Sequence, residues 1–408
     1  MNNSNNNNRV RQFIVNLDDN PYHRWDHVAR EYKDKIKDVE RYIDQSLLSG
    51  GWLARGVLAS VQGTLGVMAK LNLVAYAKEL KGLSRELSIP LGKMVAMQLI
   101  YEASTCCTSM VIPDNQNNQV DISSSSLSSS SSSTSSPSSL VLARTMDWSM
   151  DCLKDITVEI DFHQSGASVM KATTWVGYVG VLTGIASQSK TAVSINYRRS
   201  DKGSFMDNIK NLISYKWPVG YLVRHVLSTA TNYQAVAGTL ELSGIVAPCF
   251  MTIATVDKGI VLARDPESVF RKSHVRDATN TQLEPNIQTS FNNKNKNNNC
   301  ITTQSNYFVQ TNNEEQNDND NNFLYSNERR CLAKQQLAKW IETGEPVTDD
   351  SIWNLFSTFP IHNDDTIYGT IMNPTTYSIE TRIPNTRFGF NLNNNNNNKN
   401  NKGMTSKY

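Results

Sequence analysis

The segment Cys106-Cys107-Thr108-Ser109 is followed, after a serine-rich stretch, by Leu142-Ala143-Arg144-Thr145-Met146-Asp147-Trp148. We predict that the two segments form neighbouring β-strands, with Arg144 and Met146 on one face because side chains alternate along a strand. Taken alone, Cys107 would more often be a buried core cysteine, and Arg144 with Asp147 a strand-edge ion pair. A thiol close to an arginine and an aspartate also has the chemistry of an activated nucleophile. The rest of the chain decides between these interpretations.

The chain on either side of these strands predicts an α+β fold. Residues 22–105 read as helical, because apolar residues recur at three- and four-residue spacing and Pro90 begins a further helix. Short β-type runs separated by helical stretches follow Cys107, and such an order favours packed sheets over a parallel βαβ repeat. The predicted strands are Leu140–Ala143, Ile156–Phe162, Val169–Trp175, Tyr178–Thr183, Ala192–Ile195, Phe250–Thr255, Ile260–Ala263, Asn306–Gln310, Thr366–Met372 and Tyr377–Ile383. The predicted helices among them are Met206–Ile213, Val219–Ser228, Tyr233–Leu242, Leu332–Thr343 and Asp350–Phe356.

Low-complexity segments divide the chain. Runs of Ser or Asn cannot bury apolar surface, so we expect disordered tails at 1–10 and 391–408 and solvated insertions at 115–139 and 281–305.

Composition excludes several classes of function. The 408 residues carry 40 Lys+Arg against 38 Asp+Glu, and this balance argues against nucleic acid as a partner. The stretch Gly56–Ala69 is uncharged but too short to span a membrane, so it is either a buried helix or a surface that docks on lipid. Met1–Asn8 is polar and does not read as a secretory signal peptide. No CxxC, HExxH, GxSxG, P-loop or GxGxxG pattern occurs, and His23 with His27 lacks a third ligand, so we expect no metal and no cofactor.

Six ordered landmarks resemble the acid ceramidase and N-acylethanolamine acid amidase family, whose members are N-terminal nucleophile hydrolases with a cysteine nucleophile. They cover roughly residues 11–385 without the low-complexity segments. Besides Cys107-Thr108-Ser109 with the Arg144–Asp147 strand, the landmarks are Phe13–Asp18 with Arg24-Trp25, Ile89–Lys93 before Tyr101-Glu102, Gly177–Gly184, Val309–Asn312 and Glu328–Arg330. The resemblance implies a four-layer αββα sandwich with a helical N-terminal subunit. It also implies cleavage of the Cys106–Cys107 bond into an alpha subunit (11–106) and a catalytic beta subunit (107–390).

The resemblance further implies a role for individual residues. Cys107 would be the nucleophile in preference to Cys106, since Thr-Ser follows it directly, and its freed α-amino group would act as base. Asp147 would hold that amine, and Arg144 would place positive charge near the thiolate and lower its pKa. Asn312 would donate to the oxyanion, and Arg329 would support the site electrostatically. Asn196 and Trp148 would bind substrate, with Trp148, Trp175 and Tyr178 as apolar walls for an acyl chain.

These roles predict an amidase that cleaves an N-acyl lipid, either a ceramide or an N-acylethanolamine, with peripheral contact to a membrane. Two alternatives stay open: an amidase for a more polar amide of the bile-salt or penicillin type, and a catalytically inactive binding relative. The second alternative draws on Tyr197, which stands where the family usually has Glu. The family is lysosomal, which sets an expectation for the compartment.

Overall fold

The computed structural model describes residues 8–48, 51–99, 106–114, 139–198, 207, 211, 212, 214, 216–275, 307–311 and 325–385. The low-complexity insertions predicted at 115–139 and 281–305 lie outside these ranges, except for Ser139. The predicted helix at Met206–Ile213 and the predicted oxyanion donor Asn312 also fall largely or wholly outside them.

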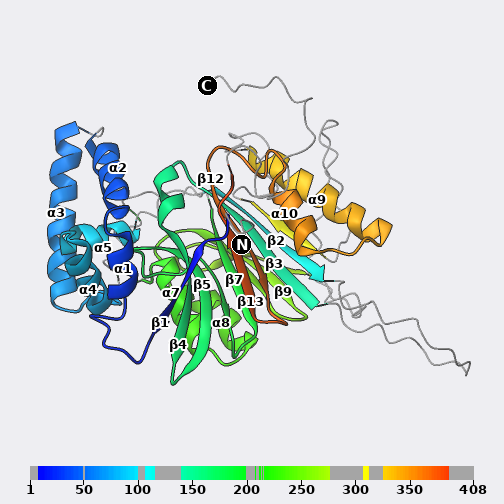
Figure 1. Ribbon diagram of the computed structural model, residues 1–408, viewed down its shortest axis with the longest axis horizontal. Coiled ribbons are helices and arrows are strands. Elements are labelled where there is room, and N and C mark those ends of the chain that lie inside the picture. Colours follow the sequence, from blue (N-terminus) through cyan, green and yellow to red (C-terminus); the bar gives the residue numbers. More distant parts are fainter. Residues whose placement is uncertain are drawn as a thin grey trace, which may run out of the picture.

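Five helices form the N-terminal unit and gather beside the sheets (Figure 1). The apolar periodicity predicted over His23–Ile43 is divided between two helices, since a turn at residues 33–35 separates them. Gly66 and Gly92 lie at the contact between the third and fifth helices, where the backbones approach closely. The five are α1 (Asp26–Tyr32), α2 (Ile36–Leu48), α3 (Gly51–Lys70), α4 (Ala77–Leu87) and α5 (Leu91–Leu99).

Two sheets form the centre of the molecule. The eight-stranded sheet has the order β1-β4-β5-β6-β7-β8-β9-β10, with β1 parallel to β4 and the other pairs antiparallel. Its strands are β1 (Arg11–Asn16), β4 (Thr157–Gln164), β5 (Ala167–Trp175), β6 (Thr183–Ala186), β7 (Thr191–Tyr197), β8 (Cys249–Ala254), β9 (Gly259–Arg264) and β10 (Val269–Val275). The five-stranded sheet has the order β11-β2-β3-β12-β13 and is antiparallel throughout. Its strands are β2 (Cys106–Asp114), β3 (Ser139–Asp147), β11 (Phe308–Gln310), β12 (Thr366–Asn373) and β13 (Ser378–Arg382).

Helices cover the outer face of each sheet, so the layers follow the order αββα. The helices α7 (Val219–Thr229) and α8 (Tyr233–Leu242) pack with the eight-stranded sheet in the largest apolar core, which also includes the N-terminal helices. The helices α9 (Ser326–Thr343) and α10 (Asp349–Phe356) pack on the five-stranded sheet, and a capping box of Thr348 and Ser351 begins α10. Side chains such as Val111 and Ile185 fill the space between the sheets. The predicted α+β sandwich is therefore confirmed.

The sequence prediction was wrong for the strand at Tyr178–Thr183. Residues 176–182 form a loop, and β6 begins only at Thr183. Gly177 has a φ of +92°, and the N–H of Val181 donates to the carbonyl of Gly220 instead of to a neighbouring strand. Two strands, β1 and β10, were not predicted.

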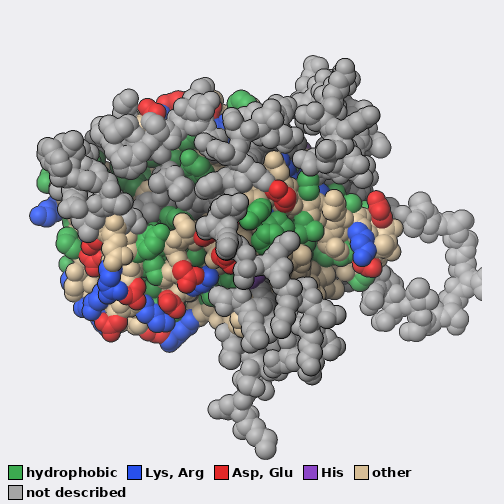
Figure 2. All heavy atoms as spheres, turned by 90° about the horizontal axis from the view of Figure 1, so that it is seen from above, with side chains coloured by type: hydrophobic (Ala, Val, Ile, Leu, Met, Phe, Trp, Pro, Cys, Tyr) green, Lys and Arg blue, Asp and Glu red, His purple; other side chains and the backbone are tan. Residues whose placement is uncertain are grey.

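The surface mixes charge and apolar area. On the face in Figure 2, acidic and basic side chains lie interleaved, with small apolar patches between them. Helix α3 has a dual character, because Leu65 and Ala69 are buried whereas Val67 is 57% exposed. Among the described residues, no helix has both the length and the hydropathy to cross a membrane.

Candidate active site

The strands β2 and β3 pair as predicted and bring Cys107 beside Arg144. Cys107 lies opposite Met146 in an antiparallel register that extends from Cys106 opposite Asp147 to Asp114 opposite Ser139. Because side chains alternate along a strand, Cys107, Arg144 and Met146 share one face and Asp147 lies on the other. The side chain of Cys106, the alternative nucleophile, is outside the described residues.

The Cys107 thiol lies in a fully buried polar environment. The guanidinium Nη2 of Arg144 donates to Cys107 Sγ at 2.7 Å, and its Nη1 donates to Thr183 Oγ1 at 2.6 Å. The Thr183 hydroxyl is also 2.9 Å from the hydroxyl of Tyr368, and the Arg144 guanidinium lies 5.6 Å from the centre of the Tyr368 ring. All these side chains have at most 1% exposure.

Burial and the arginine act on the thiol in opposite directions. Burial raises the pKa of Cys107 above its ordinary value, and the nearby charge of Arg144 only partly offsets this effect. The predicted effect of Arg144, a lowering of the thiol pKa, therefore has the right sign, but burial has the larger effect and the net pKa is raised. The desolvation of a thiolate in a fully buried position outweighs one adjacent cation.

Asp147 and Arg329 form a buried ion pair on the opposite face of the two strands. Arg329 Nη1, from α9, lies 2.5 Å from Asp147 Oδ2 and 3.1 Å from Thr108 Oγ1, and both charged side chains are fully buried. The hydroxyl of Thr366 donates to Asp147 Oδ1 at 2.8 Å. Burial raises the pKa of Asp147, and the charge of Arg329 opposes that rise.

Asn196 is connected to the nucleophile strand through Ser109. The Ser109 hydroxyl donates to Asn196 Oδ1 at 2.7 Å, and Asn196 Nδ2 donates to the carbonyl of Gln310 at 2.9 Å. Asn196 is fully buried, and these two hydrogen bonds fix β7 against β2 and β11. The structure thus brings Cys107, Arg144, Asp147 and Arg329 together. It places Asn196 of β7 against Ser109, which is two residues along β2 from Cys107.

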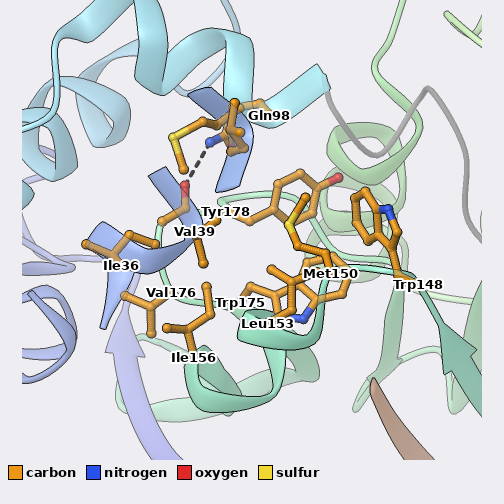
Figure 3. A pocket seen from close by; sticks show the side chains of 13 residues that line it. Ile36, Val39, Gln98, Trp148, Met150, Leu153, Ile156, Trp175, Val176 and Tyr178 are labelled. Carbon is orange, nitrogen blue, oxygen red and sulfur yellow. Dashed lines mark hydrogen bonds between the residues drawn. The ribbon is translucent and has the colours of Figure 1, made fainter. Parts of the chain in front are cut away.

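Trp148 lines an apolar cavity of about 40 Å³ next to this cluster. Figure 3 shows Ile36 and Val39 of α2, Gln98 of α5 and the aromatic side chains of Trp148, Trp175 and Tyr178 around it. The Trp175 ring centroid lies 5.6 Å from that of Trp148 and 6.2 Å from that of Tyr368. A continuous set of aromatic rings therefore connects the cavity with the surroundings of Cys107.

Comparisons with known proteins find relatives of this chain. The family model described as the beta subunit of N-acylethanolamine-hydrolyzing acid amidase matches residues 8–68. Acid ceramidase of Bos taurus is 26% identical over 377 residues, with 90% of this chain and 85% of the relative covered. An uncharacterized protein, R632, of Acanthamoeba polyphaga mimivirus is 26% identical over 364 residues, with 87% of this chain and 94% of the relative covered.

The chain is therefore similar to the acid ceramidase and N-acylethanolamine acid amidase family. Among solved structures, the Caenorhabditis elegans N-acylethanolamine-hydrolyzing acid amidase ortholog matches with a TM-score of 0.47 and 23% identity, covering 66% of this chain and 96% of that chain.

Sequence reasoning missed several members of this cluster. Thr183 and Tyr368 complete the surroundings of Arg144, and Thr366 binds Asp147, yet none of the three was singled out. Thr183 lies inside the landmark Gly177–Gly184 and could have been found there, whereas no local pattern marks Thr366 or Tyr368. Within the described ranges, no group of three or more His, Cys, Asp or Glu side chains is arranged to hold a metal ion.

Proposed function

We propose that this chain hydrolyses the amide bond of an N-acyl lipid of the ceramide or N-acylethanolamine class, with Cys107 as the nucleophile. Its similarity to acid ceramidases supports a hydrolase acting on carbon–nitrogen bonds. The observation that carries the proposal is the 2.7 Å contact between Arg144 and the Cys107 thiol beside a cavity with apolar walls. Thiol catalysis divides a difficult amide hydrolysis into acylation and deacylation.

The proposal includes cleavage of the Cys106–Cys107 peptide bond by the chain itself. Before this cleavage the Cys107 nitrogen is an amide and cannot accept a proton. Addition of water across the peptide bond frees an α-amino group with an ordinary pKa of about 7.7–8.0, which can take the thiol proton. The cleavage then leaves an N-terminal chain ending at Cys106 and a second chain beginning with Cys107.

Arg144 and Arg329 have different parts in this scheme. Arg144 stabilises the thiolate formed when the proton moves to the amine, because its guanidinium already contacts the sulfur. Arg329 holds the Asp147 carboxylate, which in the cleaved enzyme orients the new ammonium group. We assign this orienting role to Asp147 because Asp147 of β3 lies opposite Cys106 of β2, next to the proposed cleavage site.

Asn312 is proposed as the donor to the oxyanion. The described part of β11 places Gln310 opposite Ser109 in an antiparallel pair. Asn312 follows Gln310 by two residues in the sequence, as Cys107 precedes Ser109 by two, and this matched spacing supports the assignment. One such donor contributes about 2.7–4 kcal/mol to the transition state.

The apolar cavity and helix α3 are proposed to bind the lipid. Trp148 and its neighbouring rings receive the acyl chain, and Asn196 supports the substrate side of β2 through Ser109. The exposed apolar side chains Val67, Leu71 and Leu73 near the end of α3 suit contact with a membrane surface. An acidic, lysosome-like compartment fits this proposal, because burial raises the pKa values of Asp147 and Glu159 and thereby favours the folded state at low pH.

N-terminal sequencing of the purified protein, combined with product release from ceramide and from N-palmitoylethanolamine, tests the proposal. We expect a fragment that begins at Cys107, and loss of both the fragment and the activity in Cys107→Ala. Cys152→Ala is the matched control, because Cys152 is a partly exposed thiol outside the cluster and its replacement should change neither. An uncut wild-type chain without activity at acidic and neutral pH would favour the inactive binding relative. Release of product only from polar amides would reject the lipid substrate class.

A further inference from the structure

Both the Nε2 and the Oε1 of the Gln98 side chain, from α5, form hydrogen bonds with the backbone of the loop 176–182. Its Nε2 donates to the carbonyl of Gly177 at 2.7 Å and to the carbonyl of Met94 at 3.1 Å. Its Oε1 accepts the N–H of Val179 at 2.9 Å. Gln98 is only 1% exposed, so these bonds form where no bulk water competes.

The loop 176–182 connects the apolar cavity with the surroundings of Cys107. Gly177 and Tyr178 line the cavity, as Figure 3 shows for Tyr178 beside Gln98. At the other end of the loop, the carbonyl of Leu182 accepts a hydrogen bond from Arg144 Nη1 at 3.3 Å, and Thr183 follows directly. A displacement of the loop would therefore alter the cavity wall and the contacts of Arg144 together.

Gln98 is also the structural link between the two sides of the proposed cut. It lies in the helix that ends at Leu99, ahead of Cys106, whereas Gly177 and Val179 lie after the cut. The loop has a second anchor in Arg224, whose Nη1 donates to the carbonyl of Val179 at 2.9 Å and is paired with Glu79. The N-terminal unit thus holds the loop directly through Gln98 and indirectly through Glu79.

We propose that Gln98 is a positioning residue that fixes the loop 176–182 so that the acyl cavity and Arg144 keep their geometry relative to Cys107. The inference rests on the proposed amidase function. It adds that the N-terminal unit sets acyl-chain selection through one amide side chain. A replacement of this side chain should consequently affect long-chain substrates more than short-chain ones.

Two substitutions separate positioning from simple stability. Gln98→Met keeps the approximate length but removes the hydrogen bonds at every pH. Gln98→Glu keeps the acceptor for Val179, but only its protonated carboxyl can also donate to the carbonyl of Gly177. This variant should therefore approach wild-type behaviour at about pH 4.5 and lose it at about pH 7.5. Ser84→Ala is the matched control, because Ser84 makes a side-chain bond to the backbone within the N-terminal unit, to Ile89, and does not touch the loop.

Charged and titratable neighbours do not obscure the pH comparison. Tyr178 from the loop, Tyr221 and Arg224 from α7, and Lys216 before α7 surround the two cavities that Gln98 lines. Tyrosines stay neutral and Arg and Lys stay charged between these pH values. The ion pair of Glu79 with Arg224 is common to all the proteins compared, and each variant is compared with wild type at the same pH.

The experiment measures kcat/KM for N-palmitoyl and N-butyryl amides and, separately, hydrogen exchange of the Val179 amide in intact protein. For Gln98→Met we expect a loss of roughly tenfold or more with the long chain, several times the loss with the short chain. We also expect Val179 to exchange roughly tenfold faster, because its acceptor is gone. Gln98→Glu should recover the long-chain rate at the lower pH only, and Ser84→Ala should match wild type in both assays.

Equal losses for both chain lengths, or unchanged Val179 exchange in Gln98→Met, would overturn the positioning role. If wild type cleaves neither amide, the proposed function fails, and the exchange measurement alone decides whether Gln98 holds the loop. If Gln98→Met does not fold, the pH-dependent recovery of Gln98→Glu decides the question, and its absence counts against the inference.

Discussion

Removal of the Arg329 guanidinium is expected to leave a buried charge without its main partner. In Arg329→Met, the Asp147 carboxylate loses the contact at 2.5 Å and keeps the hydroxyl of Thr366. Two unit charges about 4 Å apart interact by about 4 kcal/mol at an effective dielectric constant of about 20. Breaking a buried pair from one side costs about 3–5 kcal/mol, so we expect the free energy of unfolding to fall by that amount at neutral pH.

The size of this loss should depend on pH in a defined direction. Burial already raises the pKa of Asp147, and loss of the Arg329 charge raises it further. For a carboxyl with a raised pKa in the folded state, the stabilising contribution is full below the unfolded pKa and disappears as the pH rises through the folded pKa. The deficit of Arg329→Met relative to wild type should therefore shrink at acidic pH, where the carboxyl binds a proton.

Urea titrations in a Cys107→Ser background measure this effect without interference from the proposed cut. The double substitution Asp147→Asn with Arg329→Met should recover much of the loss, because no buried charge is left. Arg41→Met is the control for removal of an arginine, since the pair with Asp38 is 65% and 58% exposed and should contribute less than about 1 kcal/mol. A loss below about 1 kcal/mol for Arg329→Met at neutral pH, or a loss that does not change with pH, would refute the reasoning.

Three further predictions follow from packing, titration and the arginine contacts. The added Cβ of Gly92→Ala would collide with the backbone of α3, so this variant should lower the unfolding free energy by about 1–3 kcal/mol. Gly63→Ala has open space for its Cβ and should raise the unfolding free energy by about 0.5–1 kcal/mol. Thermal melts of both variants check this pair of predictions. Burial raises the pKa of Glu159, so wild-type stability should decline as the pH rises from about 4.5, and Glu159→Gln should flatten that decline in melts recorded over the same range. Thr183→Val removes the acceptor at 2.6 Å from Arg144 and should lower kcat of the amidase severalfold while the N-terminal cut at Cys107 still occurs, as single-turnover assays and mass spectrometry can determine.

The pairing of the nucleophile strand could be predicted from sequence because both strands have strong local signals. The spacing of Arg144 and Met146 fixes a common face in any β-strand, and the structure has both beside Cys107. The strand at Thr366–Met372 was likewise predicted and forms β12. Its side chains Thr366 and Tyr368 contact the cluster from more than two hundred positions away in the sequence, and no local pattern specifies which strand lies next to β3.

Prediction failed where local residue preference and tertiary context disagree. The run Tyr178–Thr183 has β-type residues, but the positive φ of Gly177 and the bonds of the loop to Gln98 and Arg224 hold it outside the sheet. Strand β1 was missed because its partner β4 is supplied by a segment far along the chain, and its parallel pairing leaves no hairpin signal. The net direction of the Cys107 pKa could not be predicted either, because it depends on complete burial.

The alternation of side chains in β2 and β3 places two arginine contacts on opposite faces of the five-stranded sheet. On the face between the sheets, Arg144 contacts the sulfur of Cys107, and on the face toward α9, Arg329 neutralises Asp147. The positive charge on the second face is thus matched by a carboxylate, whereas the contact on the first face is with a thiol whose pKa burial has raised. Ionisation of that thiol would place a negative charge directly against Arg144. The proposed mechanism therefore places the thiolate against Arg144, and it requires a nearby group that can accept the thiol proton.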